Sequence, residues 1–234
     1  MSASIAIITA RGGSKRIPRK NIKAFCGKPI IAYSIEAALT SGLFEEVMVS
    51  TEDAEIARIA CEYGAKVPFM RSSESAGDYA STDDVLLEVL KAYQEQGREF
   101  DSFCCLYPTA PFVTAQKLKM AMKLLEKADS VMPVVAFSFP PQRCMVINDA
   151  GELRMKWPEH ARTRSQDLEP YYHDCGQFYC CRTAPFLQYR TTDLSRMLPM
   201  IMSEMEVQDI DNQDDWAIAE LKYQQMIMKK SFDR

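Results

Sequence analysis

Short apolar runs alternate with amphipathic helical patterns along most of the chain, and this alternation limits the available folds more than any other feature. A strand, a helix and a second strand in that order connect with right-handed crossovers, which gives a parallel sheet covered by helices. The pattern therefore predicts a doubly wound α/β fold. Strands are predicted at residues 5–8, 46–50, 66–70, 103–107 and 131–135, and helices at 29–41, 53–63, 82–96 and 115–127.

The alternation breaks at Phe137, and residues 137–172 are predicted to form an excursion from the core sheet. Within it, two apolar runs flank an Asn-Asp-Ala-Gly turn, which is typical of a β-hairpin. A strand at 178–181 and a helix at 214–229 complete the pattern. With 234 residues and 47% apolar content, we expect one catalytic-size domain over residues 1–234.

Composition excludes several classes of protein. The net charge of −4 argues against nucleic-acid binding, and the apolar runs are too short for a bilayer, so no membrane is expected. No charged and apolar leader is recognisable at the start, which favours a cytoplasmic protein. Four of the eight cysteines form adjacent pairs inside apolar runs, Cys104-Cys105 and Cys180-Cys181, and are expected to be reduced thiols.

A basic loop follows the first predicted strand. Six cations and no carboxylate lie between Arg11 and Lys23, whereas a solvated surface loop, the alternative, usually mixes charges. Open α/β sheets bind ligands at the carboxyl ends of their strands. Gly12 and Gly13 would let the backbone approach an oligophosphate, and Arg11, Lys15 and Lys20 would neutralise it.

An acidic pair, Asp209 and Asp211, precedes the last helix. In extended backbone, residues two apart lie on one face, so the two carboxylates would point together while Ile210 enters the core. Two such carboxylates suit Mg²⁺, which also takes substrate phosphates. The alternative is helix capping by Asp211 or Asn212. A basic loop and an acidic pair together predict a nucleoside triphosphate bound with magnesium.

The basic loop also carries a resemblance. Its sequence ARGGSKRIPRKN (residues 10–21) resembles the signature of the CMP-sialic acid synthetase (acylneuraminate cytidylyltransferase) family, and FCGKPIIAYSIEAAL (residues 25–39) looks most like the pseudaminic acid branch. The resemblance covers nearly the whole chain and implies a Rossmann-like nucleotidyltransferase. Such an enzyme transfers CMP from CTP to the anomeric hydroxyl of a nine-carbon keto-sugar acid and releases pyrophosphate.

The resemblance assigns roles residue by residue. It implies Arg11, Lys20, Asp209 and Asp211 as catalytic, with the two aspartates holding Mg²⁺. Ser81 with Asp84 alone reads as a capping box, but the resemblance places Ala80 and Ser81 at the base and Arg71 on the nucleotide. The implied nucleotide-binding residues are Ala10, Arg11, Gly12, Gly13, Ser14, Lys15, Lys20, Asn21, Arg71, Ala80 and Ser81.

The sugar side is assigned to Tyr107, Thr109, Arg164, Gln166 and Gln177, with Arg164 as the grip on the sugar carboxylate. Tyr107 stands where the sialic acid branch has glutamine, Phe112-Val113 where it has arginine, and Cys175 where it has asparagine. These departures favour a less polar sugar, pseudaminic acid. A CMP-sialic or CMP-legionaminic acid synthetase and a non-catalytic nucleotide sensor are the alternatives. The excursion at 137–172 is expected to cover the sugar site and to pair with a second copy, the alternative being a loop region without a role. The resemblance implies a homodimer in which the excursion reaches toward the partner's active site.

Overall fold

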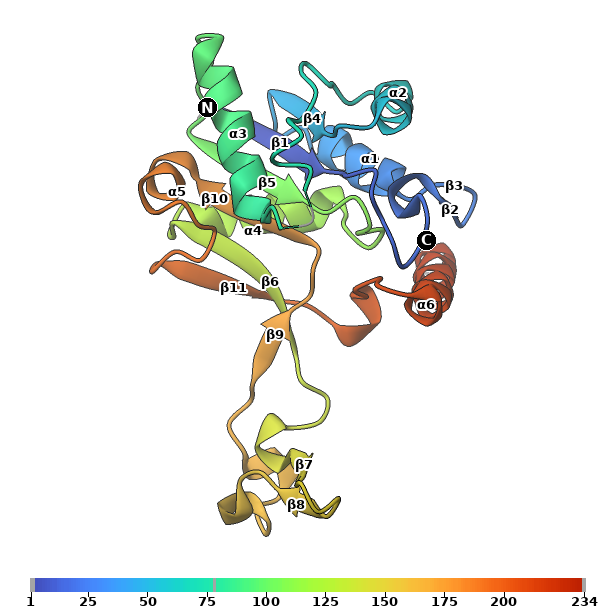
Figure 1. Ribbon diagram of the computed structural model, residues 1–234, viewed down its shortest axis with the longest axis vertical. Helices are drawn as coiled ribbons and strands as arrows, with labels where there is room; N and C mark the ends of the chain where they lie inside the picture. Colours follow the sequence, from blue (N-terminus) through green and yellow to red (C-terminus); the bar gives the residue numbers. More distant parts are fainter. Residues whose placement is uncertain (1–2, 78, 233–234) are drawn as a thin grey trace.

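A computed structural model describes residues 3–77 and 79–232, and it has the predicted α/β fold (Figure 1). Seven strands form the central sheet in the order β11-β6-β10-β5-β1-β4, with β9 paired to β6. The pairs β1–β4, β1–β5 and β6–β11 are parallel, while β10 runs antiparallel to β5 and β6. The strands are β1 Ser4–Thr9, β4 Glu46–Ser50, β5 Ser102–Leu106, β6 Ser130–Ala136, β9 Tyr172–Asp174, β10 Phe178–Arg182 and β11 Met197–Ile201.

Helices cover both faces of the sheet because the central strands alternate between two cores. Ala6 and Ile8 of β1 pack with residues of α1, α2 and α4, whereas Ile5 and Ile7 pack with α3 and α5. This two-sided burial makes the fold doubly wound, as predicted. The helices are α1 Ile31–Ser41, α2 Ala54–Glu62, α3 Thr82–Glu95, α4 Ala115–Leu125, α5 Thr183–Tyr189 and α6 Gln213–Phe232.

Local signals set the helix ends. The side chains of Asp53, Ser81 and Thr114 accept hydrogen bonds from first-turn N–H groups of α2, α3 and α4. Gly42 ends α1 with a φ of 67°, a conformation that costs glycine nothing. The predicted helix start at Pro29 was two residues early, because Lys28–Pro29 forms strand β3 of a short hairpin with β2, Ala24–Phe25.

The predicted strand at 66–70 is wrong beyond its first residue. Lys66 makes a parallel bridge with Met48, and the chain then leaves the sheet. Pro68 has no N–H to continue a ladder, and Arg71 next bonds the carbonyl oxygen of Thr51 through its own N–H. Strand β11 and helix α5 were not predicted.

Residues 137–171 form an arm that projects from the ends of β6 and β9 (Figure 1). At its far end lies the predicted hairpin, β7 Met145–Ile147 with β8 Leu153–Met155. Large apolar side chains of the arm are exposed, including Phe139 at 86%, Ile147 at 73% and Leu153 at 63%. A single chain therefore leaves much of the arm's apolar surface uncovered.

Helix α6 returns from the C-terminal part of the chain to the segment that follows the basic loop. Trp216 and Tyr223 both make edge contacts with Phe25, with ring centroids 5.5 Å apart in each pair, and Tyr223 also contacts Tyr33. Ile210 and Ile17 belong to the same buried cluster. This cluster brings the acidic pair beside the basic loop.

All eight cysteines are free thiols. Complete burial raises the pKa of Cys105 to about 12, which keeps this thiol protonated at neutral pH. None of the helices in residues 3–77 and 79–232 has the length and apolar character that crossing a membrane requires.

Candidate active site

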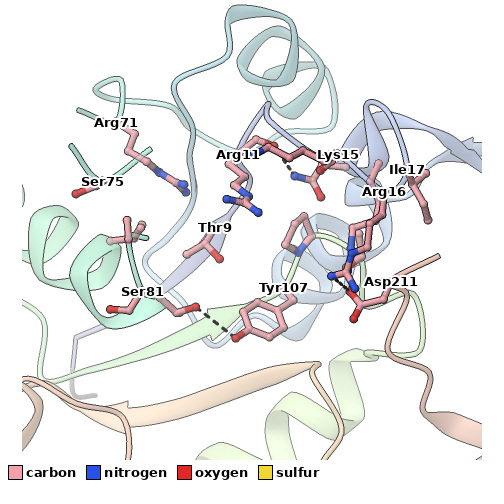
Figure 2. Close-up of a pocket in the computed structure, with 18 of the residues that line it drawn as sticks. Thr9, Arg11, Lys15, Arg16, Ile17, Arg71, Ser75, Ser81, Tyr107 and Asp211 are labelled. Carbon is pink, nitrogen blue, oxygen red and sulfur yellow. Dashed lines mark hydrogen bonds and ion pairs between the residues drawn. The ribbon is translucent and has the colours of Figure 1, made fainter. Parts of the chain in front are cut away.

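A cleft of about 350 Å³ opens at the carboxyl edge of β1 and β5 (Figure 2). This is the edge at which open α/β sheets bind ligands. The cleft is lined by the basic loop, by the segment leading into α3, by the loop after β5 and by the acidic pair. These residues are Thr9, Arg11, Ser14, Lys15, Arg16, Ile17, Lys20, Asn21, Arg71, Ser75, Gly77, Ala80, Ser81, Thr82, Val85, Tyr107, Pro108, Thr109, Asp209 and Asp211.

Most of the predicted site residues meet in this cleft. The lining includes Arg11, Ser14, Lys15, Lys20, Asn21, Arg71, Ala80, Ser81, Tyr107, Thr109, Asp209 and Asp211. Six predicted residues are not part of it. Ala10 is buried, and Gly12 and Gly13 belong to the basic loop but are not in the lining. Arg164 and Gln166 lie on the arm. Gln177 is buried, and its carbonyl oxygen accepts from the N–H of Tyr107.

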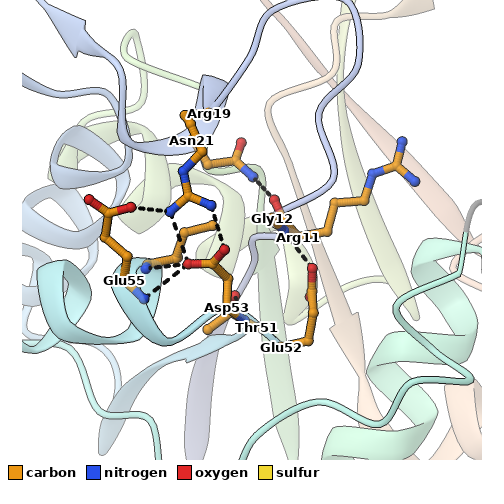
Figure 3. Close-up of polar contacts among 9 residues, drawn as sticks. Arg11, Gly12, Arg19, Asn21, Thr51, Glu52, Asp53 and Glu55 are labelled. Carbon is orange, nitrogen blue, oxygen red and sulfur yellow. Dashed lines mark hydrogen bonds and ion pairs between the residues drawn. The ribbon is translucent and has the colours of Figure 1, made fainter.

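One peptide group of the basic loop is fixed at both of its polar atoms (Figure 3). Asn21 donates a 2.8 Å hydrogen bond from Nδ2 to the carbonyl oxygen of Arg11. The N–H of Gly12, in the same peptide group, donates to Oε1 of Glu52 at 2.5 Å. Asn21 thus supports the loop in addition to lining the cleft.

Gly12 is required by its surroundings in the fold. A Cβ atom at this position would lie 2.7 Å from Oδ2 of Asp53 and 3.1 Å from its Cβ, far inside ordinary contact. At Gly13 a Cβ would meet nothing within 4 Å. The two glycines are therefore not equivalent, although both were predicted for close approach of phosphate.

Arg19 ties the loop to α2. With a φ of 56°, it pairs with Asp53 and also bonds Glu55 at 2.5 Å (Figure 3). The hydrogen bond from Arg19 is the main cause that lowers the pKa of Asp53 to about 2. Arg19 is not among the residues that line the cleft, whereas Arg11, Lys15, Arg16 and Lys20 are.

Lys20 connects the basic loop with the acidic pair. Its Nζ donates a 2.6 Å hydrogen bond to the carbonyl oxygen of Ile210 and lies 3.9 Å from Oδ1 of Asp211. Burial lowers the pKa of Lys20, and the charges of Asp211 and Asp209 oppose that shift. The ammonium is thus held at a fixed place between the two walls.

Asp209 and Asp211 both face the cleft, and Ile210 between them is fully buried, as predicted. Burial, and then the charge of Asp211, raise the pKa of Asp209. Arg16 pairs with Asp211 at 2.7 Å. Repulsion between the two carboxylates is therefore met in part by protein cations.

Capping accounts for the neighbouring polar residues. Oδ1 of Asn212 accepts from the N–H groups of Asp214 and Asp215, and Oδ2 of Asp215 accepts from those of Asp211 and Asn212. The carboxylates of Asp209 and Asp211 do not cap α6. The part of the chain that the structure describes holds no cluster of three or more His, Cys, Asp or Glu ligands.

The opposite wall carries Arg71 and the start of α3. Nε and Nη2 of Arg71 donate to the side-chain and carbonyl oxygens of Ser50 at 3.0 and 2.6 Å. Ser81 and Asp84 form the predicted capping box, with Oγ of Ser81 donating to Asp84 at 2.7 Å. The side chain and the N–H of Ser81 are therefore both occupied at the helix start.

Three positions differ from the pattern of the sialic acid branch, and of these Tyr107 lines the cleft. Its hydroxyl lies 3.3 Å from Oγ1 of Thr82, and its ring meets the edge of Tyr179, whose hydroxyl donates to Asp174. Phe112 is fully buried against Tyr223. Cys175 is buried too, so these two residues have no direct contact with a ligand in the cleft.

The remaining sugar candidates lie elsewhere in the single chain. Arg164 is exposed on the arm and pairs with Asp167 at 2.7 and 3.0 Å. Gln177 donates from Nε2 to the carbonyl oxygen of Glu206, and its buried Oε1 has no hydrogen-bond partner within residues 3–77 and 79–232. Gln166 is close to Arg164, in the 3-10 turn Ser165–Asp167.

Sequence reasoning missed several lining residues, namely Thr9, Arg16, Ile17, Ser75, Gly77, Thr82, Val85 and Pro108. Thr9 could have been predicted, because it is the last residue of β1 and open α/β sheets bind ligands at the carboxyl ends of their strands. Ser75 and Gly77 carry no local pattern that marks them. Their place depends on how the segment before α3 folds over the cleft.

The basic loop after the first strand of an α/β sheet, opposite a carboxylate pair, defines a nucleotide-handling enzyme of the nucleotidyltransferase type. Comparison with known protein families agrees with this class and narrows it to one family. The family model described as Cytidylyltransferase matches residues 5–210, and the chain belongs to this family.

Relatives and solved structures agree with this assignment. The pseudaminic acid cytidylyltransferase of Campylobacter jejuni (strain 81-176) is 39% identical over 222 residues, which cover 94% of this chain and 96% of that one. The CMP-N,N'-diacetyllegionaminic acid synthase of Legionella pneumophila is 34% identical, over 92% and 94%. The structure of a CMP:2-keto-3-deoxy-manno-octonic acid synthetase complexed with CTP has the same fold, with a TM-score of 0.68, 20% identity and coverage of 96% and 100%.

Proposed function

We propose that this cytidylyltransferase transfers CMP from CTP to the anomeric hydroxyl of pseudaminic acid, a nine-carbon keto-sugar acid, and releases pyrophosphate. The observation that carries the proposal is that Lys20, Asp209 and Asp211 line one cleft, with the Lys20 ammonium held between the two walls. The 39% identity to the Campylobacter enzyme supports the choice of sugar.

The reaction needs placement and charge compensation more than covalent help. The sugar hydroxyl oxygen attacks the α-phosphorus, the bond to the β-phosphate oxygen breaks, and the hydroxyl proton is lost. Arg11, Lys15 and Lys20 would hold the triphosphate and stabilise the charge that develops on the leaving pyrophosphate. Because Lys20 is fixed by a carbonyl oxygen, its charge is already in place when CTP arrives.

Magnesium is part of the proposal. Asp209 and Asp211 would hold it, since both face the cleft and both offer oxygen. When bound, the ion would neutralise phosphate charge and acidify the attacking hydroxyl.

We further propose that the enzyme works as a homodimer joined through the arm. Among residues 3–77 and 79–232, none of those that line the cleft comes from the arm of the same chain, and the arm exposes Phe139, Ile147 and Leu153. Arg164 and Gln166 would then reach the cleft of a second copy. Light scattering should give a dimer mass, and Ile147→Asp should shift the protein toward the monomer.

The function is tested by pyrophosphate release from CTP and magnesium with pseudaminic, legionaminic and sialic acids in turn. We expect the highest kcat/KM with pseudaminic acid. A preference for another sugar would keep the reaction but would reject Tyr107 as its discriminator. No release with any of the three would favour a nucleotide sensor.

A further inference from the structure

Glu52 lies directly behind the phosphate-facing loop and has no place in the mechanism described so far. It follows β4 by two residues, and its Oε1 accepts the N–H of Gly12 at 2.5 Å (Figure 3). Its Oε2 is buried and lacks a hydrogen-bond partner in residues 3–77 and 79–232. A buried carboxylate oxygen of this kind is costly unless its charge is used.

The hydrogen bond fixes the direction of Arg11. Glu52 holds the N–H and Asn21 the carbonyl oxygen of the peptide group between Arg11 and Gly12. With both polar atoms held, this peptide plane cannot rotate without breaking one of the two bonds. The Arg11 side chain, which lines the cleft, therefore leaves the backbone at a set angle.

The charge of Glu52 acts on Arg71, whose guanidinium and N–H bond Ser50 and Thr51, the two residues just before Glu52. Arg11 and Arg71 both point into the cleft, from opposite walls (Figure 2). Burial lowers the pKa of Arg71, the charges of Glu52 and then Glu88 oppose this shift, and the charge of Arg11 adds to it. Glu88 also bonds the N–H and hydroxyl of Ser72, whereas Oε2 of Glu52 has no such partner.

The backbone around Glu52 is rigid. Oγ1 of Thr51 accepts from the N–H of Asp53, and Asp53 caps α2 and pairs with Arg19. The carboxylate is thus presented from a fixed helix start, which is what a positioning group needs.

We propose that Glu52 is a positioning residue of the phosphate-binding loop, which orients Arg11 through the Gly12 N–H and serves as a resident counter-charge of Arg71. When the triphosphate binds, its negative charge takes over this role. The identity of that ligand rests on the proposed function, but the two roles of Glu52 rest on the contacts above.

Two variants separate the roles, because both remove the charge and only one removes the acceptor. Glu52→Gln keeps an oxygen for Gly12, so the loop stays oriented while the repulsion felt by a bound anion disappears. We expect its Kd for pyrophosphate to fall about threefold, and its Tm without ligand to be lower than that of the wild type. Glu52→Ala loses the acceptor as well, and its Kd should rise about tenfold.

Calorimetric titration with magnesium pyrophosphate, and separately with CTP, gives these constants without turnover. Glu55→Gln is the matched control, since it removes a carboxylate from the same helix start that bonds Arg19 and does not touch Gly12; its Kd should match that of the wild type. Equal Kd values for Glu52→Gln and Glu52→Ala would overturn the role of the hydrogen bond.

Weaker binding by Glu52→Gln than by the wild type would overturn the counter-charge role. Failure of the wild type to bind either ligand would overturn the proposed function, whereas wild-type binding with the same Kd in both Glu52 variants would overturn this inference alone. Kinetics give a further readout, because Glu52→Ala should raise the KM for CTP more than it lowers kcat. A change confined to kcat would also contradict the proposal.

Discussion

Nζ of Lys20 lies 3.9 Å from Oδ1 of Asp211, although 190 residues separate Lys20 from the Ile210 carbonyl that it also binds. The contact joins a loop near the start of the chain to a segment that follows the last sheet strand. The cleft is thus lined by cations of the basic loop and by two carboxylates, and Asp211 pairs directly with Arg16 and Lys20. The predictions below test what each side contributes.

Replacing Lys20 by alanine should lower kcat at least about a hundredfold, because a preorganised charge on the leaving group is lost. The Tm should change little, since burial of the ammonium offsets much of what its contacts contribute. Pyrophosphate release and thermal unfolding measure the two effects. Lys23→Ala is the control, as Lys23 lies over the ring of Trp216 outside the cleft lining; wild-type rates for Lys20→Ala would remove Lys20 from the mechanism.

Asp209→Asn should abolish turnover without loss of stability. Burial and Asp211 raise the pKa of Asp209, so a neutral isostere removes repulsion in the folded state. Turnover as a function of magnesium concentration is the measurement, with unfolding in urea beside it. Asp214→Asn, in the exposed first turn of α6, should behave as the wild type. An active Asp209→Asn enzyme with unchanged magnesium dependence would exclude this carboxylate as a metal ligand.

The two loop glycines should respond differently to alanine. At Gly12 the new Cβ meets the Asp53 side chain, which Arg19 and the α2 N–H groups hold in place, so we expect a loss of about 1–3 kcal/mol of stability and a raised KM for CTP. At Gly13 the Cβ enters open space, and stability should stay within about 0.5 kcal/mol of the wild type. Equal losses in urea unfolding would contradict the contact with Asp53.

The Arg19–Asp53 pair should make stability depend on pH at the acid end. The pKa of folded Asp53 is lowered to about 2, below its value in the unfolded chain. The stability that the ion pair contributes is therefore fully present above the unfolded pKa of Asp53 and is lost as the pH falls toward 2. Arg19 is 39% exposed, and solvent screening reduces the effect to about 1 kcal/mol at neutral pH. Asp53→Asn keeps the helix cap, so the stability difference from wild type should shrink between pH 5 and 2. A difference that is constant with pH would mean that the charge of Asp53 does not contribute to stability.

Arg164→Ala should raise the KM for the sugar more than the KM for CTP, because a guanidinium grips a carboxylate through two hydrogen bonds. Arg154 is the matched control, since it is also an exposed arm arginine, paired with Glu152. Initial rates with each substrate varied in turn decide the matter. If the KM for CTP rises instead, Arg164 belongs to the nucleotide site.

Much of the fold could be predicted because its signals are local. The apolar run at β4 gave the strand at Glu46–Ser50, and Ser81 marked the start of α3. Strand β11 was missed because Pro199 argues against a strand, and an edge position, which only the assembled sheet defines, makes that proline tolerable. Residues 66–70 show the reverse, a strand-like pattern that the sheet does not use.

The site divides in the same way. Charge alone predicted the basic loop and the acidic pair, and the period of two in extended backbone placed Asp209 and Asp211 on one face. Charge could not tell that Arg19 turns toward Asp53 or that Glu52 holds Gly12, because both depend on where α2 begins in space. Phe112 shows the same limit, since its burial follows from its contact with α6.

The aromatic cluster of α6 has a consequence for how the enzyme is made. The basic loop is synthesised early. The acidic pair, Asp209 and Asp211, follows nearly two hundred residues later, together with α6, whose Trp216 packs against Phe25. A chain that stops before Asp209 contains all the sheet strands and the whole basic loop, but neither carboxylate. Such a fragment lacks the acidic pair and also the aromatic contacts that α6 makes with Phe25 beside the basic loop.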